Sequence, residues 1–118
     1  MTSVRGITFD CVNAAAAARF WASTLDGYVL AESSKDSADV RIGALRLAFR
    51  RVPERKYVKN RVHLDLATDA FELDCARLLA LGAVRLDDLT LPDRRWTTFA
   101  DLEGNEFDLL YRAETASM

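Results

Sequence analysis

The chain carries one order of sequence signals twice, and this repeat constrains its fold more than any other feature. Residues 4–12 alternate apolar and polar side chains, which is the period of a strand with one buried face, and residues 61–66 repeat the alternation. Each strand is followed by a helical stretch and a glycine, and the two glycines, Gly27 and Gly82, lie 55 residues apart. The chain is therefore predicted to contain a duplicated unit.

The same offset of 55 residues aligns the polar sides of the two strands. It carries Thr8 onto His63 and Asp10 onto Asp65, so these four side chains are predicted to face away from the helices. The apolar side chains predicted to pack against the helices are Ile7, Phe9, Val62 and Leu64.

Each predicted helix has a start signal and a repeated apolar stripe. Asn13 is the expected cap of a helix over residues 14–25, and Asp69 is the expected cap of a helix over residues 70–81. The stripe of the first helix is Ala17, Phe20, Trp21, Thr24 and Leu25. The stripe of the second helix is Leu73, Ala76, Arg77, Leu78 and Leu81.

Three further strands are predicted after each helix. The first half has them at residues 28–33, 39–42 and 45–52, and the second half at residues 84–91, 96–101 and 106–112. Clusters of polar residues, glycine or proline mark turns at 33–37, 92–93 and 103–105. The order of elements predicts an α+β fold built from two βαβββ modules in tandem.

We expect the modules to form a single domain over residues 1–118. Module one spans about residues 3–52, a linker spans about residues 53–60, and module two spans about residues 61–113. Each module is near the size at which one hydrophobic core becomes marginal, so neither is expected to be stable alone.

Charge and cysteine content exclude several classes of protein. The net charge of -2 and the pI near 5.4 argue against a nucleic-acid binder, which would carry a strongly basic surface. Cys11 and Cys75 form no CxxC pair and no cluster with histidine, so we expect reduced, buried thiols. No apolar stretch has membrane-spanning length, and we expect a soluble, cytoplasmic protein.

Three motifs, in this order and spacing, resemble the vicinal oxygen chelate superfamily. They are RVHLDL at residues 61–66, LALGA at 79–83 and the turn DLEGNEF at 101–107. Within that superfamily the chain is similar to small glyoxalase-like and bleomycin-resistance-like proteins. The resemblance implies that the two modules form a cup-shaped antiparallel or mixed sheet, the glyoxalase/bleomycin-resistance/dioxygenase fold. It also implies a binding site in the cup and a homodimer.

In catalytic relatives, the first and last strands of each module supply His, Glu or Gln ligands to a divalent metal. The resemblance places His63 and Asp108 at two of these positions. The repeat places Thr8, a poor ligand, and Ala48, which cannot bind metal, at the other two, and Asp10 is the nearest carboxylate. Catalytic metal sites normally use three or more protein ligands. We therefore expect no metal cofactor, with a divalent ion on His63, Asp108 and Asp10 as the alternative.

Charged and aromatic residues near the expected cup are candidate ligand-binding groups. Arg50 and Arg61 lie at strand ends, where they would attract an anion or simply be solvated. Trp96 would stack on a flat ligand or lie in the core or a dimer interface. His63 and its neighbouring aspartates also fit a structural hydrogen-bond network. The candidate set is Asp10, Arg50, His63, Asp65, Trp96 and Asp108.

These residues support two classes of function. The first is a glyoxalase-like protein that binds a small polar or zwitterionic organic molecule in a concave cup without a catalytic metal. The second is a metal-dependent lyase, isomerase or dioxygenase with an incomplete ligand set. An interaction module that has lost its ligand is a third interpretation. The missing ligands favour the first, and the sequence leaves open whether the chain is an enzyme.

Overall fold

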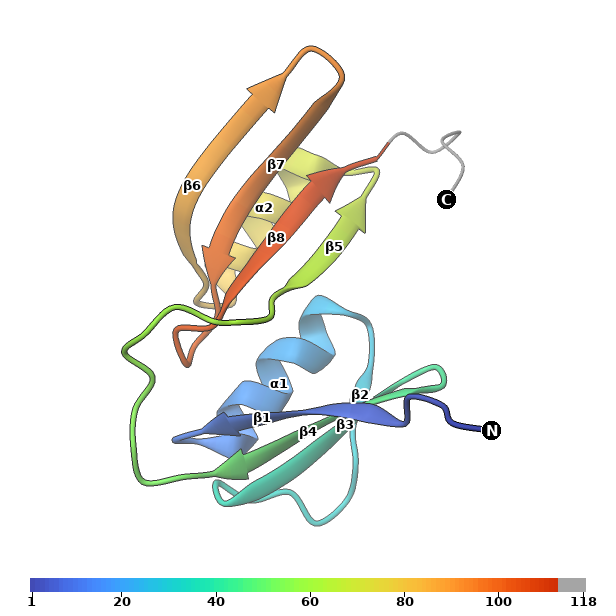
Figure 1. Cartoon of the computed structure of the whole chain (residues 1–118), viewed down its shortest axis with the longest axis vertical. Helices are drawn as coiled ribbons and strands as arrows, with labels where there is room; N and C mark the ends of the chain where they lie inside the picture. The colour runs from blue at the N-terminus through green and yellow to red at the C-terminus, as the bar shows by residue number, and fades with distance from the viewer. Residues whose placement is uncertain (113–118) are drawn as a thin grey trace. The chain divides into compact units, whose positions relative to one another are not determined.

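The computed structural model of the chain describes residues 1–112, and within them the order β, α, β, β, β occurs twice (Figure 1). The chain divides into two compact units with a boundary between Lys56 and Tyr57, inside the predicted linker. Each unit holds one helix and one four-stranded sheet. The predicted α+β fold of two βαβββ modules is confirmed. Ala113, the predicted end of module two, lies outside the described residues.

Module one has a mixed sheet in which its first and last strands are neighbours. Its elements are β1 (Gly6–Cys11), α1 (Ala14–Thr24), β2 (Tyr28–Val29), β3 (Ser37–Ile42) and β4 (Leu45–Arg51). The strand order is β1-β4-β3-β2, with β1 parallel to β4 and the other pairs antiparallel. The strand predicted at residues 28–33 is shorter than expected, because the chain turns after it: the Ser33 hydroxyl donates a hydrogen bond to the Leu30 carbonyl oxygen, and the Ser34 N–H donates one to the Ser37 carbonyl oxygen.

Helix α1 begins and packs as its sequence predicts. The Asn13 side chain accepts a hydrogen bond from the Ala16 N–H at 3.1 Å, which caps the first turn. Trp21 is 1% exposed, and its ring centroid lies 5.9 Å from that of Phe9 on β1 and 5.3 Å from that of Phe20. The helix-facing side of this sheet is buried at Ala38, Val40, Leu47 and Phe49.

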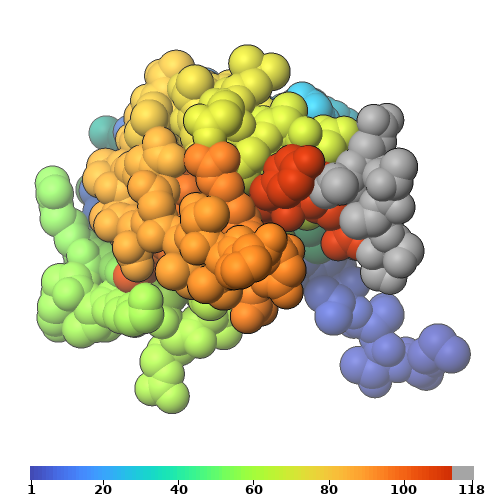
Figure 2. Space-filling view, turned by 90° about the horizontal axis from the view of Figure 1, so that it is seen from above, coloured from blue at the N-terminus to red at the C-terminus, as the bar shows by residue number. Residues whose placement is uncertain are grey.

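Module two repeats this arrangement. Its elements are β5 (Leu64–Thr68), α2 (Phe71–Ala80), β6 (Val84–Leu91), β7 (Arg94–Ala100) and β8 (Glu106–Tyr111). The strand order is β5-β8-β7-β6, with β5 parallel to β8. Strand β6 is one of the two edge strands of this sheet and is exposed along most of its length, and it lies with β7 at the surface in Figure 2 (orange).

The start of β5 differs from the prediction for a local reason. The strand begins at Leu64, and Val62, predicted to be buried, is 79% exposed. The Asn60 side chain donates hydrogen bonds to the carbonyl oxygens of Val62 at 3.2 Å and of Glu106 at 3.0 Å. The Asn60 amide thus binds the Glu106 carbonyl oxygen of β8, a backbone group that a longer β5 would have paired with instead.

The predicted buried face of α2 is confirmed at Leu78 and wrong elsewhere. Leu73 is 70% exposed, whereas Phe71, Cys75 and Leu78 are buried, at the spacing of one helical face. The predicted cap is also wrong, because no side chain caps α2 and the Thr68 hydroxyl instead accepts a hydrogen bond from the Ala70 N–H at 2.9 Å.

The two glycines that mark the repeat serve different purposes. Gly82 itself adopts a left-handed backbone, with φ +106, whereas at the end of α1 it is Asp26 that does so, with φ +53. Gly27 is required by a close approach, since a Cβ atom there would lie 2.7 Å from the Arg41 carbonyl oxygen. Among residues 1–112, no helix is both long and apolar enough to cross a lipid bilayer.

Candidate functional site

Each module has an open face, defined here as the sheet face opposite its helix. Because side chains alternate along a strand, the open face of module one carries Thr8, Ala48 and Asp39, which lie side by side on β1, β4 and β3. The open face of module two carries Asp65, Asp108 and Thr98 in the corresponding row on β5, β8 and β7. The first row is mostly small or neutral, and the second holds two carboxylates.

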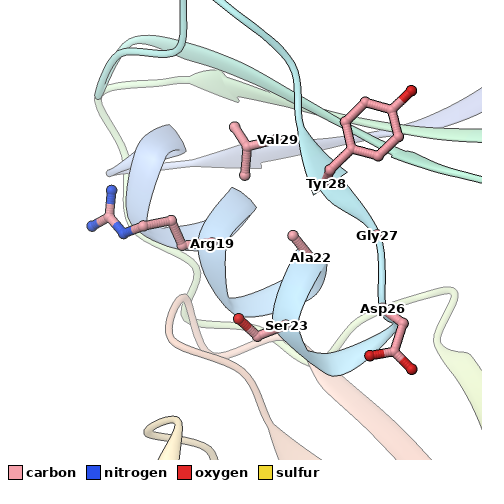
Figure 3. Close-up of a pocket in the computed structure, with 7 residues that line it drawn as sticks. All are labelled: Arg19, Ala22, Ser23, Asp26, Gly27, Tyr28 and Val29. Carbon is pink, nitrogen blue, oxygen red and sulfur yellow. The ribbon is translucent and has the colours of Figure 1, made fainter.

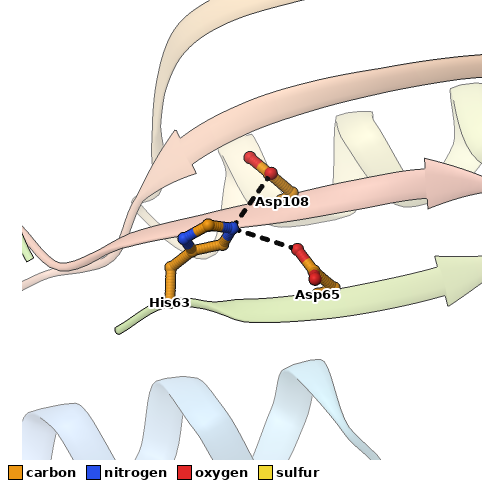
Figure 4. Close-up of side chains that lie close together, drawn as sticks. All are labelled: His63, Asp65 and Asp108. Carbon is orange, nitrogen blue, oxygen red and sulfur yellow. Dashed lines mark ion pairs between the residues drawn. The ribbon is translucent and has the colours of Figure 1, made fainter. Parts of the chain in front are cut away.

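Three of the predicted site residues meet on the open face of module two. His63 Nε2 lies 3.2 Å from Asp65 Oδ1 and 3.4 Å from Asp108 Oδ2 (Figure 4). One ligand atom from each of the three residues lies within 4.8 Å of the others. The side chains of His63 and Asp65 are 50% and 63% exposed, whereas that of Asp108 is 19% exposed. Asp108 is thus the fixed member of the group.

Thr98 holds Asp108 in place. The Thr98 hydroxyl donates a hydrogen bond to Asp108 Oδ1 at 2.5 Å, which leaves Oδ2 turned toward His63. A protonated His63 forms ion pairs with both carboxylates, while a neutral imidazole and two carboxylates offer three ligand atoms to a cation. Sequence reasoning did not single out Thr98 as a partner of Asp108, because the contact depends on the β7–β8 register.

Two of the separations in this group are close to those around a divalent ion. Nitrogen and oxygen ligands about 2.0–2.2 Å from a tetrahedral ion lie roughly 3.3–3.6 Å from one another. The His63–Asp65 and His63–Asp108 separations of 3.2 and 3.4 Å are close to that range. Asp65 supplies the third group here, whereas the sequence pointed to Asp10, which belongs to β1 of module one and lies opposite Arg50 in the β1–β4 register.

The first strands of the two modules do not align at the 55-residue offset that separates Gly27 from Gly82. Asp65, not His63, is the counterpart of Thr8: each lies six residues before the first residue of its helix, and each pairs with the last strand, at Asp108 and Ala48. His63 therefore corresponds to Gly6. A Cβ atom at Gly6 would lie 2.4 Å from the Arg46 carbonyl oxygen, so a side chain there requires β1 to move away from β4.

The open face of module one is organised around arginines. Arg50 donates a hydrogen bond to Asp39 Oδ1 at 2.7 Å, and Arg46 forms an ion pair with Asp39 Oδ2. The hydrogen bond from Arg50, and to a smaller extent the contacts of Arg46, lower the pKa of Asp39 against the opposing effect of its burial. Asp39 therefore stays ionised and orients both guanidinium groups. Sequence reasoning selected Arg50 but missed Arg46 and Asp39, although Arg46, Ala48 and Arg50 alternate with apolar residues.

A hollow of about 360 Å³ lies over this face of module one. Its lining residues are Arg5, Gly6, Ile7, Thr8, Arg46, Ala48 and Arg50. A hollow of this size holds a small organic molecule. A second hollow lies beside α1 and β2, but its charged groups, Arg19 and Asp26, lie at opposite ends and do not converge (Figure 3).

Trp96 lies on the open face of module two. It is half-buried, follows the same alternation as Thr98, and pairs with Leu110 of β8. The Arg94 guanidinium carbon lies 5.6 Å from the centroid of its ring, so the indole already makes a cation–π contact. Arg61, the other arginine expected near the cup, is exposed in the segment ahead of β5.

The glyoxalase-like domain family matches residues 6–110, nearly the whole chain. The chain belongs to this family. It is thereby a member of the vicinal oxygen chelate superfamily, as the three sequence motifs predicted. No curated protein matches the chain.

Solved structures share the fold at low sequence identity. The fosfomycin resistance protein FosX from Mesorhizobium loti is 17% identical with a TM-score of 0.75, covering 98% of this chain and 96% of that one. A glyoxylase/bleomycin resistance protein/dioxygenase domain from Frankia sp. EAN1pec is 16% identical with a TM-score of 0.72, over 98% and 96% of the two chains.

A third relative has a ligand and a metal. It is a variant of FosX from Listeria monocytogenes complexed with Mn(II) and 1S,2S-dihydroxypropylphosphonic acid, 16% identical with a TM-score of 0.73, over 92% of this chain and 89% of that one. At these identities the likeness of all three structures concerns the fold.

Proposed function

We propose that this glyoxalase-like chain binds a small polar or zwitterionic organic molecule on the open faces of its sheets, without a resident catalytic metal. The observation that carries the proposal is Gly6, the counterpart of His63 in module one. Its backbone pairing with Arg46 leaves no space for a side chain.

Metal ligation of the kind that the superfamily resemblance implies draws on both modules. In module one, the three residues at the corresponding positions are Gly6, Thr8 and Ala48. Glycine and alanine supply no side-chain ligand, and a neutral threonine hydroxyl is a weak one. A metal in this chain would therefore depend on the exposed group in module two.

The groups that are present suit a polar guest. The open face of module one presents the guanidinium groups of Arg46 and Arg50, and that of module two presents Asp65, Asp108 and the indole of Trp96. An apolar guest covering these charges would remove their remaining solvent and offer no hydrogen bonds in return, which is unfavourable. A molecule with charged or hydrogen-bonding groups avoids that cost on either face, and on module two a flat one also gains stacking on the indole.

A ligand screen with metal-free protein tests this proposal. Protein treated with EDTA and then dialysed is titrated with polar aromatic acids, amines and zwitterions, and tryptophan emission is followed. We expect saturable changes in emission that are lost in Trp96→Phe, with the same affinity before and after EDTA treatment. Binding that appears only when a divalent ion is added back would contradict the metal-free part of the proposal.

The spacing of His63, Asp65 and Asp108 supports a second candidate, a metal-dependent lyase, isomerase or dioxygenase. A divalent ion would supply Lewis-acid chemistry there. This chain's own residues would hold it through His63 Nε2 and one oxygen of each carboxylate, with Thr98 fixing Asp108.

Titration calorimetry with Mn²⁺, Ni²⁺ and Zn²⁺ distinguishes the candidates. The proposal expects no tight binding. One ion per chain at sub-micromolar affinity, lost in His63→Ala and in Asp108→Ala, would establish the second candidate instead. Asp65→Ala and Asp10→Ala then serve as a matched pair: Asp65→Ala is expected to lose the metal because it removes the third ligand of this group, and Asp10→Ala is expected to keep it.

We include in the proposal the homodimer and the cytoplasmic location that the sequence analysis expects. Sedimentation velocity at micromolar concentration is expected to give the mass of two chains. Sedimentation as a monomer of 13.2 kDa would remove the dimer from the proposal.

A further inference from the structure

We propose that the hollow on the open face of module one is an oxyanion site, which recognises a carboxylate or phosphate group through Arg5, Arg46 and Arg50. The inference rests on the proposed function and names the chemical group that this part of the site takes. It starts from how β1 and β4 shape the hollow.

The floor of the hollow is made of small residues, and its charged residues stand around them. Gly6, Thr8 and Ala48 lie on adjacent positions of β1 and β4 and rise little above the sheet. Arg46 and Arg50 flank Ala48 along β4, and Arg5 precedes Gly6. Three guanidinium groups thus surround a floor that a planar or tetrahedral oxyanion can approach closely.

Asp39 fixes two of these arginines in advance. It lies beside Ala48 in the β3–β4 register, and Arg46 and Arg50 converge on its two carboxylate oxygens from opposite sides of Ala48. The Asp39 side chain is 14% exposed, whereas those of Arg46 and Arg50 are 32% and 44% exposed. The carboxylate therefore lies beneath the cations, and the cations face the solvent.

Both arginines keep free donors for a ligand. Within residues 1–112, the hydrogen bonds of Arg50 to Asp39, Ala38 and Phe49 all run through one terminal nitrogen, and Arg46 contacts Asp39 through one terminal nitrogen. A guanidinium group carries five N–H donors in a fork that matches a carboxylate or phosphate. The remaining donors, together with those of Arg5, can bind oxyanion oxygens while the link to Asp39 stays intact.

Charge favours an anion over other guests. The titratable residues that line the hollow are all arginines. Two carboxylates lie on the same sheet face: Asp39 pairs with both Arg46 and Arg50, and Asp10 lies opposite Arg50 in the β1–β4 register. The arginines outnumber these carboxylates, so the face keeps a net positive charge. A cationic ligand would meet repulsion there, and a neutral one would leave the arginines without new partners.

Two-dimensional ¹H–¹⁵N NMR titration of the full chain tests the inference. The probes are inorganic phosphate, benzoate, and the matched compounds benzyl alcohol and benzylammonium. We expect phosphate or benzoate to shift the amide signals of Gly6, Thr8 and Ala48 saturably, with affinity falling several-fold as NaCl rises from 50 to 300 mM. A shift with phosphate alone identifies the inorganic ion as the ligand, and a stronger one with benzoate identifies an organic acid.

Variants separate the hollow from general surface charge. Arg50→Gln is expected to weaken binding about tenfold, the loss that one charge-assisted hydrogen bond commonly carries. Arg5→Gln is expected to weaken it several-fold without affecting the fold, because Arg5 is exposed and precedes β1. Arg51→Gln is the matched control: Arg51 is next to Arg50 but pairs with Asp36 at 3.2 Å and does not line the hollow. The affinity of Arg51→Gln for the oxyanion is expected to equal that of the wild type.

Three results would overturn the oxyanion assignment. They are equal binding of benzyl alcohol and benzoate, preferential binding of benzylammonium, and loss of affinity in Arg51→Gln equal to that in Arg5→Gln and Arg50→Gln. If neither oxyanion shifts the module-one amides while the fluorescence screen still finds a ligand, this inference fails and the proposed function stands. If no compound binds in either experiment, the proposed function fails.

Discussion

Replacing Trp21 by alanine removes the largest fully buried side chain among residues 1–112. The indole packs near the rings of Phe9 and Phe20 and is 1% exposed. An aromatic side chain buries about 150–250 Å², which at about 25 cal/mol per Å² corresponds to about 4–6 kcal/mol, and alanine retains a small share of it. Aromatic-to-alanine substitutions in protein cores cost about 3–5 kcal/mol. We therefore expect a loss of about 4 kcal/mol, a large part of the total of about 5–15 kcal/mol for a small domain.

Urea unfolding followed by far-ultraviolet circular dichroism measures the loss. The chain has two tryptophans, so in Trp21→Ala the remaining one, Trp96, reports on module two by its fluorescence while dichroism follows both modules. Trp21→Phe is the control, since it keeps a ring at the site and is expected to lose less than half as much stability. A loss below about 1.5 kcal/mol for Trp21→Ala would refute the assignment of the indole to the core of module one.

Three further predictions concern charge, thiols and backbone space. The pKa of Asp39 is lower in the folded chain than in the unfolded chain, chiefly through the hydrogen bond from Arg50. The ion pairs of Asp39 therefore stabilise the fold fully when the pH is above the unfolded pKa, and this effect is lost as the pH falls through the folded pKa. The stability difference between wild type and Asp39→Asn in urea is expected to be largest at pH 7 and to shrink below about pH 4; a difference independent of pH would contradict this. Cys11 and Cys75 are buried, and burial raises the pKa of the Cys75 thiol, so a thiol reagent should label neither in the native chain and both in urea; rapid labelling of the native chain would show that one is accessible. Gly6→Ala is expected to lower the unfolding free energy by about 1–3 kcal/mol in urea, because its Cβ atom forces β1 away from β4, and an unchanged free energy would weaken the metal-free proposal.

Sequence periodicity predicted the parts of the fold that depend on local signals. The Asn13 cap was predicted because a capping residue directly precedes the helical run, and the buried stripe with Phe20 and Trp21 was predicted because one apolar face recurs clearly along α1. In α2, apolar side chains occur on several faces, Leu73 and Leu79 among them, so the pattern alone did not select the face of Phe71, Cys75 and Leu78. Packing against the sheet selected it.

The candidate site was predicted less completely because it depends on contacts between strands. The alternation around His63 placed His63 and Asp65 on one side, and the turn motif placed Asp108 on the last strand, so the members of this group were all candidates. The counterpart of His63 was misassigned, since the offset measured between the glycines differs from the offset of the strands. The partnership of Asp39 with Arg50 required the β3–β4 register, which no single strand encodes.

The parallel pairing of β1 with β4 sets an order of events during synthesis. Each residue pair in this ladder is separated by 40 residues in the chain, and β1 lies at the sheet edge with β4 as its neighbour. The antiparallel pair of β3 and β4 is joined by a short turn and closes a much smaller loop. As the nascent chain emerges from the ribosome, β1 is therefore expected to wait, unpaired, until residues 45–51 follow it out. The first strand of this sheet to be made is the last to be bound, and module one has all of its strands outside the ribosome before β5 emerges.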